Sequence, residues 1–167
     1  MTINENGNYA ATVVTNDGTF KIQLLPKVAP LAVNNFVFLA RHHYYDGVIF
    51  HRIISNFMVQ TGDPTGTGTG GPGYSFRIEK TSLPYTLGTV AMANTGQANS
   101  NGSQFFIIVV KSYPLQPNYT VFGKVISGMS AVLKIAQTPV GPSPGNQGEI
   151  SYPLKTVLMK KVTIQAS

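Results

Sequence analysis

Short runs of β-branched and aromatic residues, broken by glycine and proline, dominate the hydrophobic pattern of the chain. Residues 9–14 and 19–25 flank Thr15-Asn16-Asp17-Gly18, a turn of the Asp-Gly type that favours positive φ. These segments predict a β-hairpin. Further strand-like runs cover 48–54, 57–60, 87–93, 105–110, 119–125 and 155–164.

Two segments repeat their apolar residues with a helical period. Pro30 suits the first position of a helix, and Val33, Phe36, Val37 and Ala40 then share one face, which predicts a helix over 30–41. A shorter amphipathic helix is predicted over 129–136. Many short strands with two isolated helices are typical of a closed or nearly closed β-barrel whose ends the helices cover.

The composition is that of a folded single domain without thiol chemistry. The chain has 167 residues, which suits one domain and a core of its own. It contains no cysteine, and this excludes disulfides, thiol nucleophiles and metal sites that need thiolate ligands. Charged residues make up only 11% of the chain and hydrophobic residues 43%, so the chain is expected to fold.

The net charge of +6 comes mainly from the second half. Residues 1–83 hold six Lys or Arg and five Asp or Glu, whereas residues 84–167 hold six bases and one acid. No basic cluster exceeds Lys160-Lys161, and a solvated basic face explains the excess better than a specific nucleic-acid surface.

The first eight residues are polar and rich in Asn, and we interpret them as a loose N-terminal stub. They have no basic region followed by an apolar one, so they do not resemble a signal peptide. No run approaches the roughly 18 consecutive apolar residues of a membrane span. The protein is expected to be soluble, either cytoplasmic as it stands or exported if a leader or anchor has been removed.

Three sequence features that could indicate nucleotide binding, metal binding or hydrolysis do not support those functions. Gly66, Gly68 and Gly71 satisfy the dinucleotide pattern GxGxxG, but Pro72-Gly73 follows where that pattern requires a helix, so 62–73 is interpreted as an irregular loop. The adjacent His42 and His43 suit contact with carbonyls at a helix end better than metal binding. No GxSxG segment stands in the strand-turn-helix context of a nucleophile elbow, which argues against a serine hydrolase.

The informative segments are 50–63, 91–94 and 101–108. Strand alternation places Phe50, Arg52 and Ile54 on one face, and Met58 and Gln60 on one face. A permanently charged arginine on a largely apolar sheet surface needs a carboxylate, a cluster of carbonyls or a ligand.

At these segments the chain resembles the cyclophilins, which are peptidyl-prolyl cis-trans isomerases. The resemblance spans nearly the whole chain and is specific, because FHRII, FMVQTGD, MAN and NGSQFF occur in the family's order and at near-family spacing. It implies one domain over 1–167, mainly β, with a closed eight-stranded antiparallel β-barrel capped by two α-helices. The groove of the family lies on the outside of the barrel.

The resemblance also implies the residues of the site. Arg52 would be the catalytic residue, and no metal or other cofactor would be needed. The proline pocket would be lined by Phe57, Met58, Phe106 and Leu115. Gln60, Ala93, Asn94 and Gln104 would bind the substrate backbone and flanking residues, with Tyr119 at the pocket rim.

The implied function is isomerisation of X-Pro bonds, which assists protein folding. The partners would be proline-containing peptides and unfolded or flexible chains, and the protein would act as a monomer. The alternative is a binding module of the same fold that holds proline-containing segments with incidental turnover.

The chain departs from the commonest eukaryotic pattern at two rim positions. Pro114 replaces a Trp whose indole donates a hydrogen bond to cyclosporin, so cyclosporin is expected to bind weakly. Tyr119 replaces a His but keeps a hydroxyl and an aromatic wall. The stretch 94–104 is one residue longer than in those members.

Overall fold

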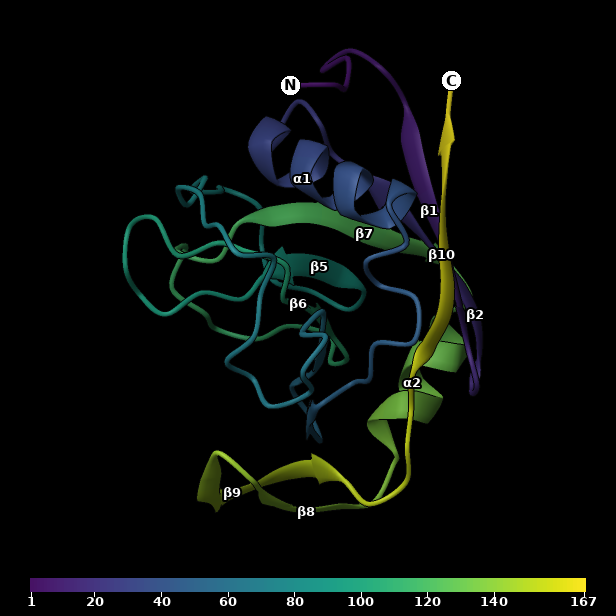
Figure 1. The fold of residues 1–167 in the computed structure, drawn as a ribbon, viewed down its shortest axis with the longest axis vertical. Coiled ribbons are helices and arrows are strands. Elements are labelled where there is room, and N and C mark those ends of the chain that lie inside the picture. The colour runs from purple at the N-terminus through teal and green to yellow at the C-terminus, as the bar shows by residue number, and fades with distance from the viewer.

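An eight-stranded antiparallel sheet forms the body of the protein in a computed structural model that describes residues 1–167 (Figure 1). Its strands follow the order β10-β1-β2-β7-β5-β6-β4-β3. The strands are β1 (Tyr9–Thr15), β2 (Gly18–Leu24), β3 (Arg52–Ile54), β4 (Met58–Thr61), β5 (Thr89–Met92), β6 (Phe105–Ile108), β7 (Val121–Ser127) and β10 (Met159–Ala166).

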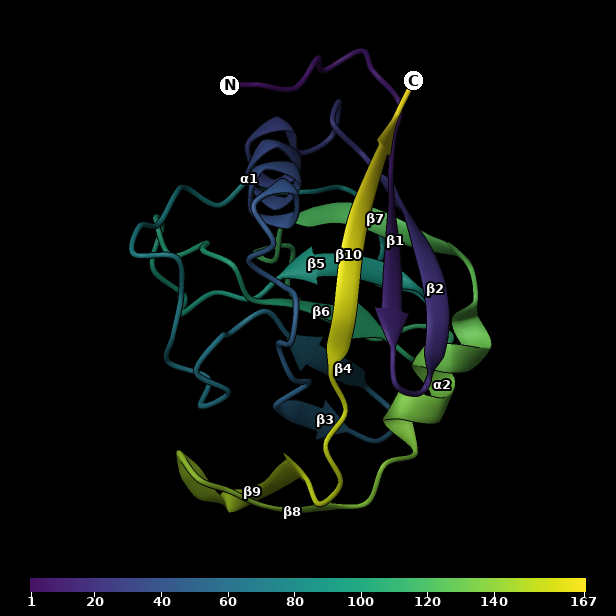
Figure 2. The ribbon, with the colours of Figure 1, turned by 45° about the vertical axis from the view of Figure 1, so that its right-hand side comes forward.

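The sheet curls until its two edge strands, β3 and β10, approach each other (Figure 2). These two strands do not pair with each other. The segment before β3 instead pairs with the start of β10 and the residues before it, where Ile49 and Leu158 form an isolated bridge. The backbone N–H of Phe50 donates to the Val157 carbonyl at 2.8 Å beside this bridge. The predicted mainly β fold with eight strands and two helices is confirmed, but the barrel is not fully closed, because β3 and β10 form no strand pair.

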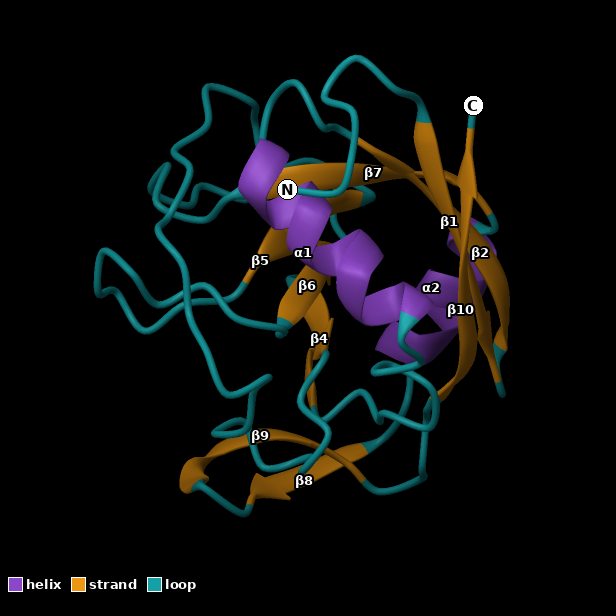
Figure 3. Ribbon diagram, turned by 45° about the horizontal axis from the view of Figure 1, so that its top comes forward, coloured by secondary structure: helices purple, strands orange, loops and turns teal.

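Two helices cover the curled sheet, α1 (Pro30–Arg41) and α2 (Met129–Ala136), and both match their predicted ranges (Figure 3). The helix α1 buries Val33, Phe36 and Val37 in a cluster of 30 residues inside the barrel, to which α2 adds Val132 and Ile135. The first turn of α1 lacks a side-chain cap of its own. The carboxylate of Glu79 accepts hydrogen bonds from the Leu31 and Ala32 N–H groups at 3.0 and 2.9 Å.

The central strands β4, β5 and β6 are buried on both faces, so their sequences do not alternate. One face points into the barrel and joins its core, with Val59, Val90 and Ile107. The other face carries a second cluster of six buried residues, which are Met58, Tyr85, Ala91, Phe106, Ile108 and Val121. An apolar surface therefore lies outside the barrel, under loops, rather than in its lumen.

A separate hairpin of β8 (Val140–Ser143) and β9 (Asn146–Pro153) lies outside the main sheet, next to β3 (Figure 2). The sequence did not predict it, because its strands are polar and rich in Gly and Pro and their register shifts twice. The hairpin places β9 beside the strand that carries Arg52.

The N-terminal residues contact α1 and the last strand. The N–H of Thr2 donates to Asn34 Oδ1 at 2.7 Å, and the N–H of Asn8 donates to the Ser167 carbonyl at 3.0 Å. Neither helix of the protein is long and apolar enough to cross a bilayer.

Candidate functional site

Arg52 lies on the outer face of the sheet, at the start of the edge strand β3. The register pairs Arg52 with Gln60 on β4, and Gln60 in turn with Phe106 on β6. Opposed residues of antiparallel strands share a face, so these three side chains lie in a row across the sheet. The predicted alternation is confirmed for Arg52 with Ile54 and for Met58 with Gln60, since Ile54 likewise faces Met58. The prediction was wrong for Phe50, which precedes β3 and lies in the core inside the barrel.

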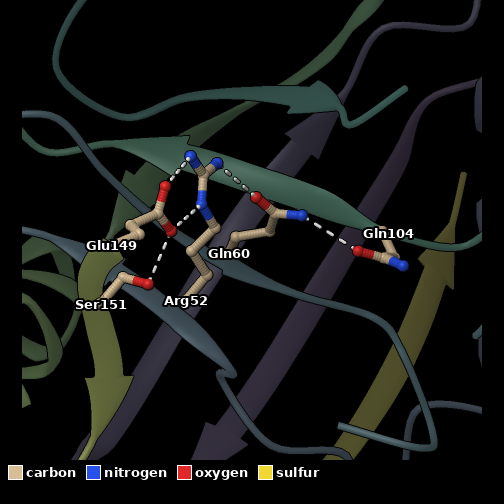
Figure 4. A network of polar contacts seen from close by, with 5 residues as sticks. All are labelled: Arg52, Gln60, Gln104, Glu149 and Ser151. Atoms are coloured by element: carbon tan, nitrogen blue, oxygen red, sulfur yellow. Dashed lines mark hydrogen bonds and ion pairs between the residues drawn. The ribbon is translucent and has the colours of Figure 1, made fainter. Parts of the chain in front are cut away.

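The guanidinium of Arg52 is held by two acceptors (Figure 4). Its Nε and Nη2 donate to Oε1 and Oε2 of Glu149 on β9 at 2.8 and 3.0 Å, and its Nη1 donates to Oε1 of Gln60 at 3.1 Å. The fork of two parallel bonds fixes the plane of the guanidinium. The Arg52 side chain is 36% exposed, so it also faces solvent.

The contacts continue from Gln60 to Gln104 (Figure 4), and from Gln104 to the glycine-rich loop, residues 62–73. Gln60 Nε2 donates to Gln104 Oε1 at 3.0 Å, and Gln104 Nε2 donates to the carbonyls of Gly68 and Gly70 at 2.9 and 3.0 Å. These bonds also assign the amide orientations, because each oxygen accepts and each nitrogen donates. The row of polar side chains that begins at Arg52 thus ends on the backbone carbonyls of the loop.

A cavity of about 240 Å³ opens beside Arg52 on this face. Nine of the ten residues that the sequence placed at the site line it together: Arg52, Phe57, Met58, Gln60, Ala93, Asn94, Phe106, Leu115 and Tyr119. Tyr113 lines it as well and was not predicted. The cavity therefore combines one permanent cation with a mostly apolar wall.

Aromatic rings form much of this wall. Tyr113 stacks on Phe57 with ring centroids 3.9 Å apart, and Tyr119 meets Phe106 edge to face at 5.6 Å. The backbone of Tyr119 is fixed by the Tyr85 hydroxyl, which donates to its carbonyl at 2.8 Å. The rings are thus held by packing and by hydrogen bonds from the cluster beneath them.

Gln104 is the predicted residue that lies outside this cavity. It lines a neighbouring polar groove of about 460 Å³ together with the glycine-rich loop and Ser100. Gln60, Ala93 and Asn94 line both spaces, so the groove and the apolar cavity are continuous.

The glycine-rich loop is irregular, as predicted, and Asp63 organises it. The buried carboxylate of Asp63 accepts hydrogen bonds from Thr65 N and Oγ1 and from the N–H groups of Gly68 and Gly70, at 2.7–3.0 Å. Burial alone raises the pKa of this carboxyl, but the hydrogen bonds together outweigh burial and lower the pKa to about 2.

The histidines take no part in the cavity. His42 Nδ1 donates to the Phe38 carbonyl at 2.8 Å, which confirms the predicted contact at the end of α1. His51 is buried and neither of its ring nitrogens has a partner in the protein. Burial lowers the pKa of His51 and so favours its neutral form.

Two residues of the site were missed at the sequence level, Tyr113 and Glu149. Nothing in the strand pattern distinguishes Tyr113, which lies in a loop. For Glu149 the signal in the sequence was only partial, because an arginine on an apolar face needs a counter-charge but any of the six acids of the chain could supply it. Hydrogen bonding from Arg52 is the main reason that the pKa of Glu149 falls to about 2.

Comparison with known proteins agrees with this geometry. The profile of the family described as "Cyclophilin type peptidyl-prolyl cis-trans isomerase/CLD" matches residues 10–164. Human peptidyl-prolyl cis-trans isomerase-like 3 is 43% identical over 164 residues, covering 95% of this chain and 97% of its own length. A putative peptidyl-prolyl cis-trans isomerase of Staphylococcus aureus is 35% identical, with 96% and 94% covered.

Solved structures show the same similarity. A cyclophilin type peptidyl-prolyl cis-trans isomerase of Cryptosporidium parvum superposes with a TM-score of 0.86 at 34% identity, covering 96% of this chain and 99% of that one. A second structure of the same enzyme, determined in the presence of the dipeptide Ala-Pro, gives a TM-score of 0.85. This chain therefore belongs to the cyclophilin-type peptidyl-prolyl cis-trans isomerase family.

Proposed function

We propose that this chain catalyses rotation about X-Pro bonds in flexible or unfolded polypeptides and thereby assists their folding, with Arg52 as the catalytic residue. The observation that carries the proposal is the placement of the Arg52 guanidinium beside an apolar cavity of about 240 Å³. A cavity of that kind suits a pyrrolidine ring. The structure of the related enzyme with Ala-Pro supports a proline-containing ligand.

The chemistry follows from the amide bond. The barrier to rotation, about 18–20 kcal/mol, exists because the nitrogen shares its lone pair with the carbonyl. As the bond twists, the lone pair localises on nitrogen and can accept a hydrogen bond. A guanidinium N–H directed at that nitrogen therefore binds the twisted state better than either planar state. Arg52 needs no change of protonation to do this.

The other residues of the cavity hold the substrate while one side of the bond turns. Phe57, Met58 and Phe106 would enclose the ring, whereas Gln60, Asn94 and Gln104 offer polar groups to the flanking backbone. Raising an uncatalysed rate of about 0.01–0.1 s⁻¹ to about 10³ s⁻¹ requires roughly 5.5–7 kcal/mol. A single charge-assisted hydrogen bond supplies about 1.5–3 kcal/mol, so positioning must contribute the remainder.

Exchange spectroscopy on a short Ala-Pro peptide tests the proposal. Wild-type protein should accelerate cis-trans exchange over buffer, and Arg52→Ala should lower the catalysed rate about 100-fold or more. A wild-type rate equal to that of buffer would exclude catalysis and leave the binding module. An Arg52→Ala rate equal to wild type would exclude the proposed role of Arg52.

Cyclosporin is a weak ligand in this proposal. Pro114 is exposed beside the cavity and has no N–H to offer the inhibitor. Calorimetry should therefore show weak cyclosporin binding by a protein that retains isomerase activity. A nanomolar dissociation constant would contradict this expectation.

A further inference from the structure

Glu149 is the one acidic group that contacts Arg52, and it comes from outside the main sheet. It lies on β9 of the separate hairpin, 97 residues from Arg52 in sequence, and accepts both bonds of the fork. Glu149 does not line the apolar cavity. Glu149 lies on the side of the guanidinium opposite Gln60 (Figure 4), and its place outside the cavity indicates an action on Arg52 and not on the substrate.

The contact with Glu149 leaves some of the N–H donors of Arg52 free. A guanidinium has five N–H donors. Glu149 takes those on Nε and Nη2, and Gln60 takes one on Nη1, which leaves one free N–H on each terminal nitrogen. The carboxylate therefore occupies the side of the guanidinium and leaves donors at its far end for a ligand.

Without Glu149 the guanidinium would keep a single hydrogen bond, to the uncharged amide oxygen of Gln60. Arg52 is 36% exposed, and a long flexible side chain with one weak contact samples several rotamers. A donor that must meet a nitrogen only in the twisted state is sensitive to such disorder, because a misplacement of 1 Å can cost about 100-fold in rate.

The carboxylate is itself supported. Ser151 on the same strand donates its hydroxyl to Glu149 Oε1 at 2.6 Å. Gln60, on the opposite side of the guanidinium, is fixed by Gln104, which is bound to the carbonyls of Gly68 and Gly70. Arg52 is thus clamped between two anchored acceptors from different parts of the fold.

We propose that Glu149 is a positioning residue for isomerisation: its bidentate contact with Arg52 fixes the plane of the guanidinium and directs the two free N–H donors toward the proline pocket. This inference rests on the proposed function, in which Arg52 is catalytic. No proton moves and Glu149 does not touch the substrate.

The same contact has an opposing effect, since a carboxylate weakens the positive field of the guanidinium. The pair is partly exposed, with side chains 36% and 27% accessible, so solvent screens the charge effect. The geometric effect is not screened. We therefore expect removal of Glu149 to slow the reaction rather than accelerate it.

The test compares the catalysed exchange rate and the peptide dissociation constant in three variants. Glu149→Ala removes the fork and should lower the exchange rate of bound Ala-Pro peptide about 10-fold. Glu149→Gln keeps one acceptor oxygen and should lower it about 3-fold. Both variants should bind the peptide within about 2-fold of wild type, because Glu149 does not contact it.

Glu5→Ala is the matched control for net charge. Glu5 is exposed in the N-terminal segment, at the opposite end of the molecule from the β8–β9 hairpin (Figure 1). Its exchange rate should equal that of wild type. Thermal unfolding of each variant verifies the fold, and Glu149→Gln tests the proposal if Glu149→Ala does not fold.

A second readout reports on the guanidinium directly. Hydrogen exchange of the Arg52 Nε–H, assigned by its loss in Arg52→Lys, should be slow in wild type and faster in both Glu149 variants. An unchanged or raised isomerisation rate in Glu149→Ala, or a fall matched by weaker peptide binding, would overturn the positioning role. An inactive wild-type protein would instead overturn the proposed function on which it rests.

Discussion

Asp63 and Glu149 are two carboxylates with the same pKa, about 2, at opposite ends of one row of polar contacts. Asp63 shapes the glycine-rich loop whose carbonyls hold Gln104, and Glu149 holds Arg52. The causes of the two low values differ. Neutral backbone and hydroxyl donors lower the pKa of Asp63, whereas a cation lowers that of Glu149.

The surroundings of the two groups differ as well. Asp63 is fully buried, and its partners lie within seven residues of it. A methyl group on Gly70 would lie 2.0 Å from Asp63 Oδ1, so the loop closes tightly around the carboxylate. Glu149 remains partly exposed and its main partner is 97 residues away. A low pKa alone therefore does not distinguish a group that stabilises the fold from one that serves the reaction.

The largest expected effect is on stability at Asp63. Asp63→Ala leaves the N–H groups of Thr65, Gly68 and Gly70 without their acceptor in a buried site. We expect the free energy of unfolding to fall by about 3 kcal/mol or more in urea titrations. A loss below about 1 kcal/mol would show that the loop is held by other contacts.

Glu149→Ala should show the reverse pattern. The Arg52–Glu149 pair is partly exposed, so its removal should lower the free energy of unfolding by less than about 1 kcal/mol while the exchange rate falls. Urea titration and exchange spectroscopy on one preparation provide both values. If Glu149→Ala instead lost much of its unfolding free energy and kept the wild-type exchange rate per folded molecule, Glu149 would stabilise the fold as Asp63 does, and the proposed difference would be wrong.

Acid should weaken the fold through both groups. Their ordinary pKa values are 3.8 and 4.5, and both are lowered on folding, so their stabilisation is present at higher pH and lost as the pH falls toward 2. Urea midpoints between about pH 5 and pH 2 should decline in wild type. The decline should be shallower in Asp63→Asn and in Glu149→Gln, and parallel curves would contradict the assignment.

The smallest expected effects concern the supporting hydroxyls. Ser151→Ala leaves both bonds between Glu149 and Arg52, so the exchange rate should fall less than about 2-fold. Thr65→Ala removes the equivalent hydroxyl from Asp63 and should cost about 1 kcal/mol of unfolding free energy at an unchanged rate. A 10-fold rate loss in Thr65→Ala would show that the two ends of the row are coupled, whereas the same loss in Ser151→Ala would show that Glu149 depends on this hydroxyl.

The difference between local and long-range contacts also explains which parts of the fold and of the site the sequence could predict. The hairpin of β1 and β2 and both helices depend on turn residues and periodicity within a few positions, and their ranges were predicted closely. Alternation predicted that Met58 and Gln60 share a face, whereas their grouping with Arg52 was implied by the resemblance to the cyclophilins. The glycine-rich loop was predicted as irregular because proline follows its glycines.

The β8–β9 hairpin and its contact with Arg52 could not be predicted in this way. The sequence indicated that Arg52 needs a carboxylate, a carbonyl cluster or a ligand, and the carboxylate proved to be Glu149. Choosing it among six acids requires knowing which segment packs beside β3. That packing is long-range and has no local pattern, as the irregular register of the hairpin shows.

A double-mutant cycle of exchange rates tests the account most directly. Rates are measured for wild type, Glu149→Ala, Arg52→Ala and the double variant, at protein concentrations high enough to quantify the residual activity. If Glu149 acts through Arg52, Glu149→Ala lowers the rate in wild type and leaves it unchanged in the Arg52→Ala background. An equal fold-loss in both backgrounds would contradict the account.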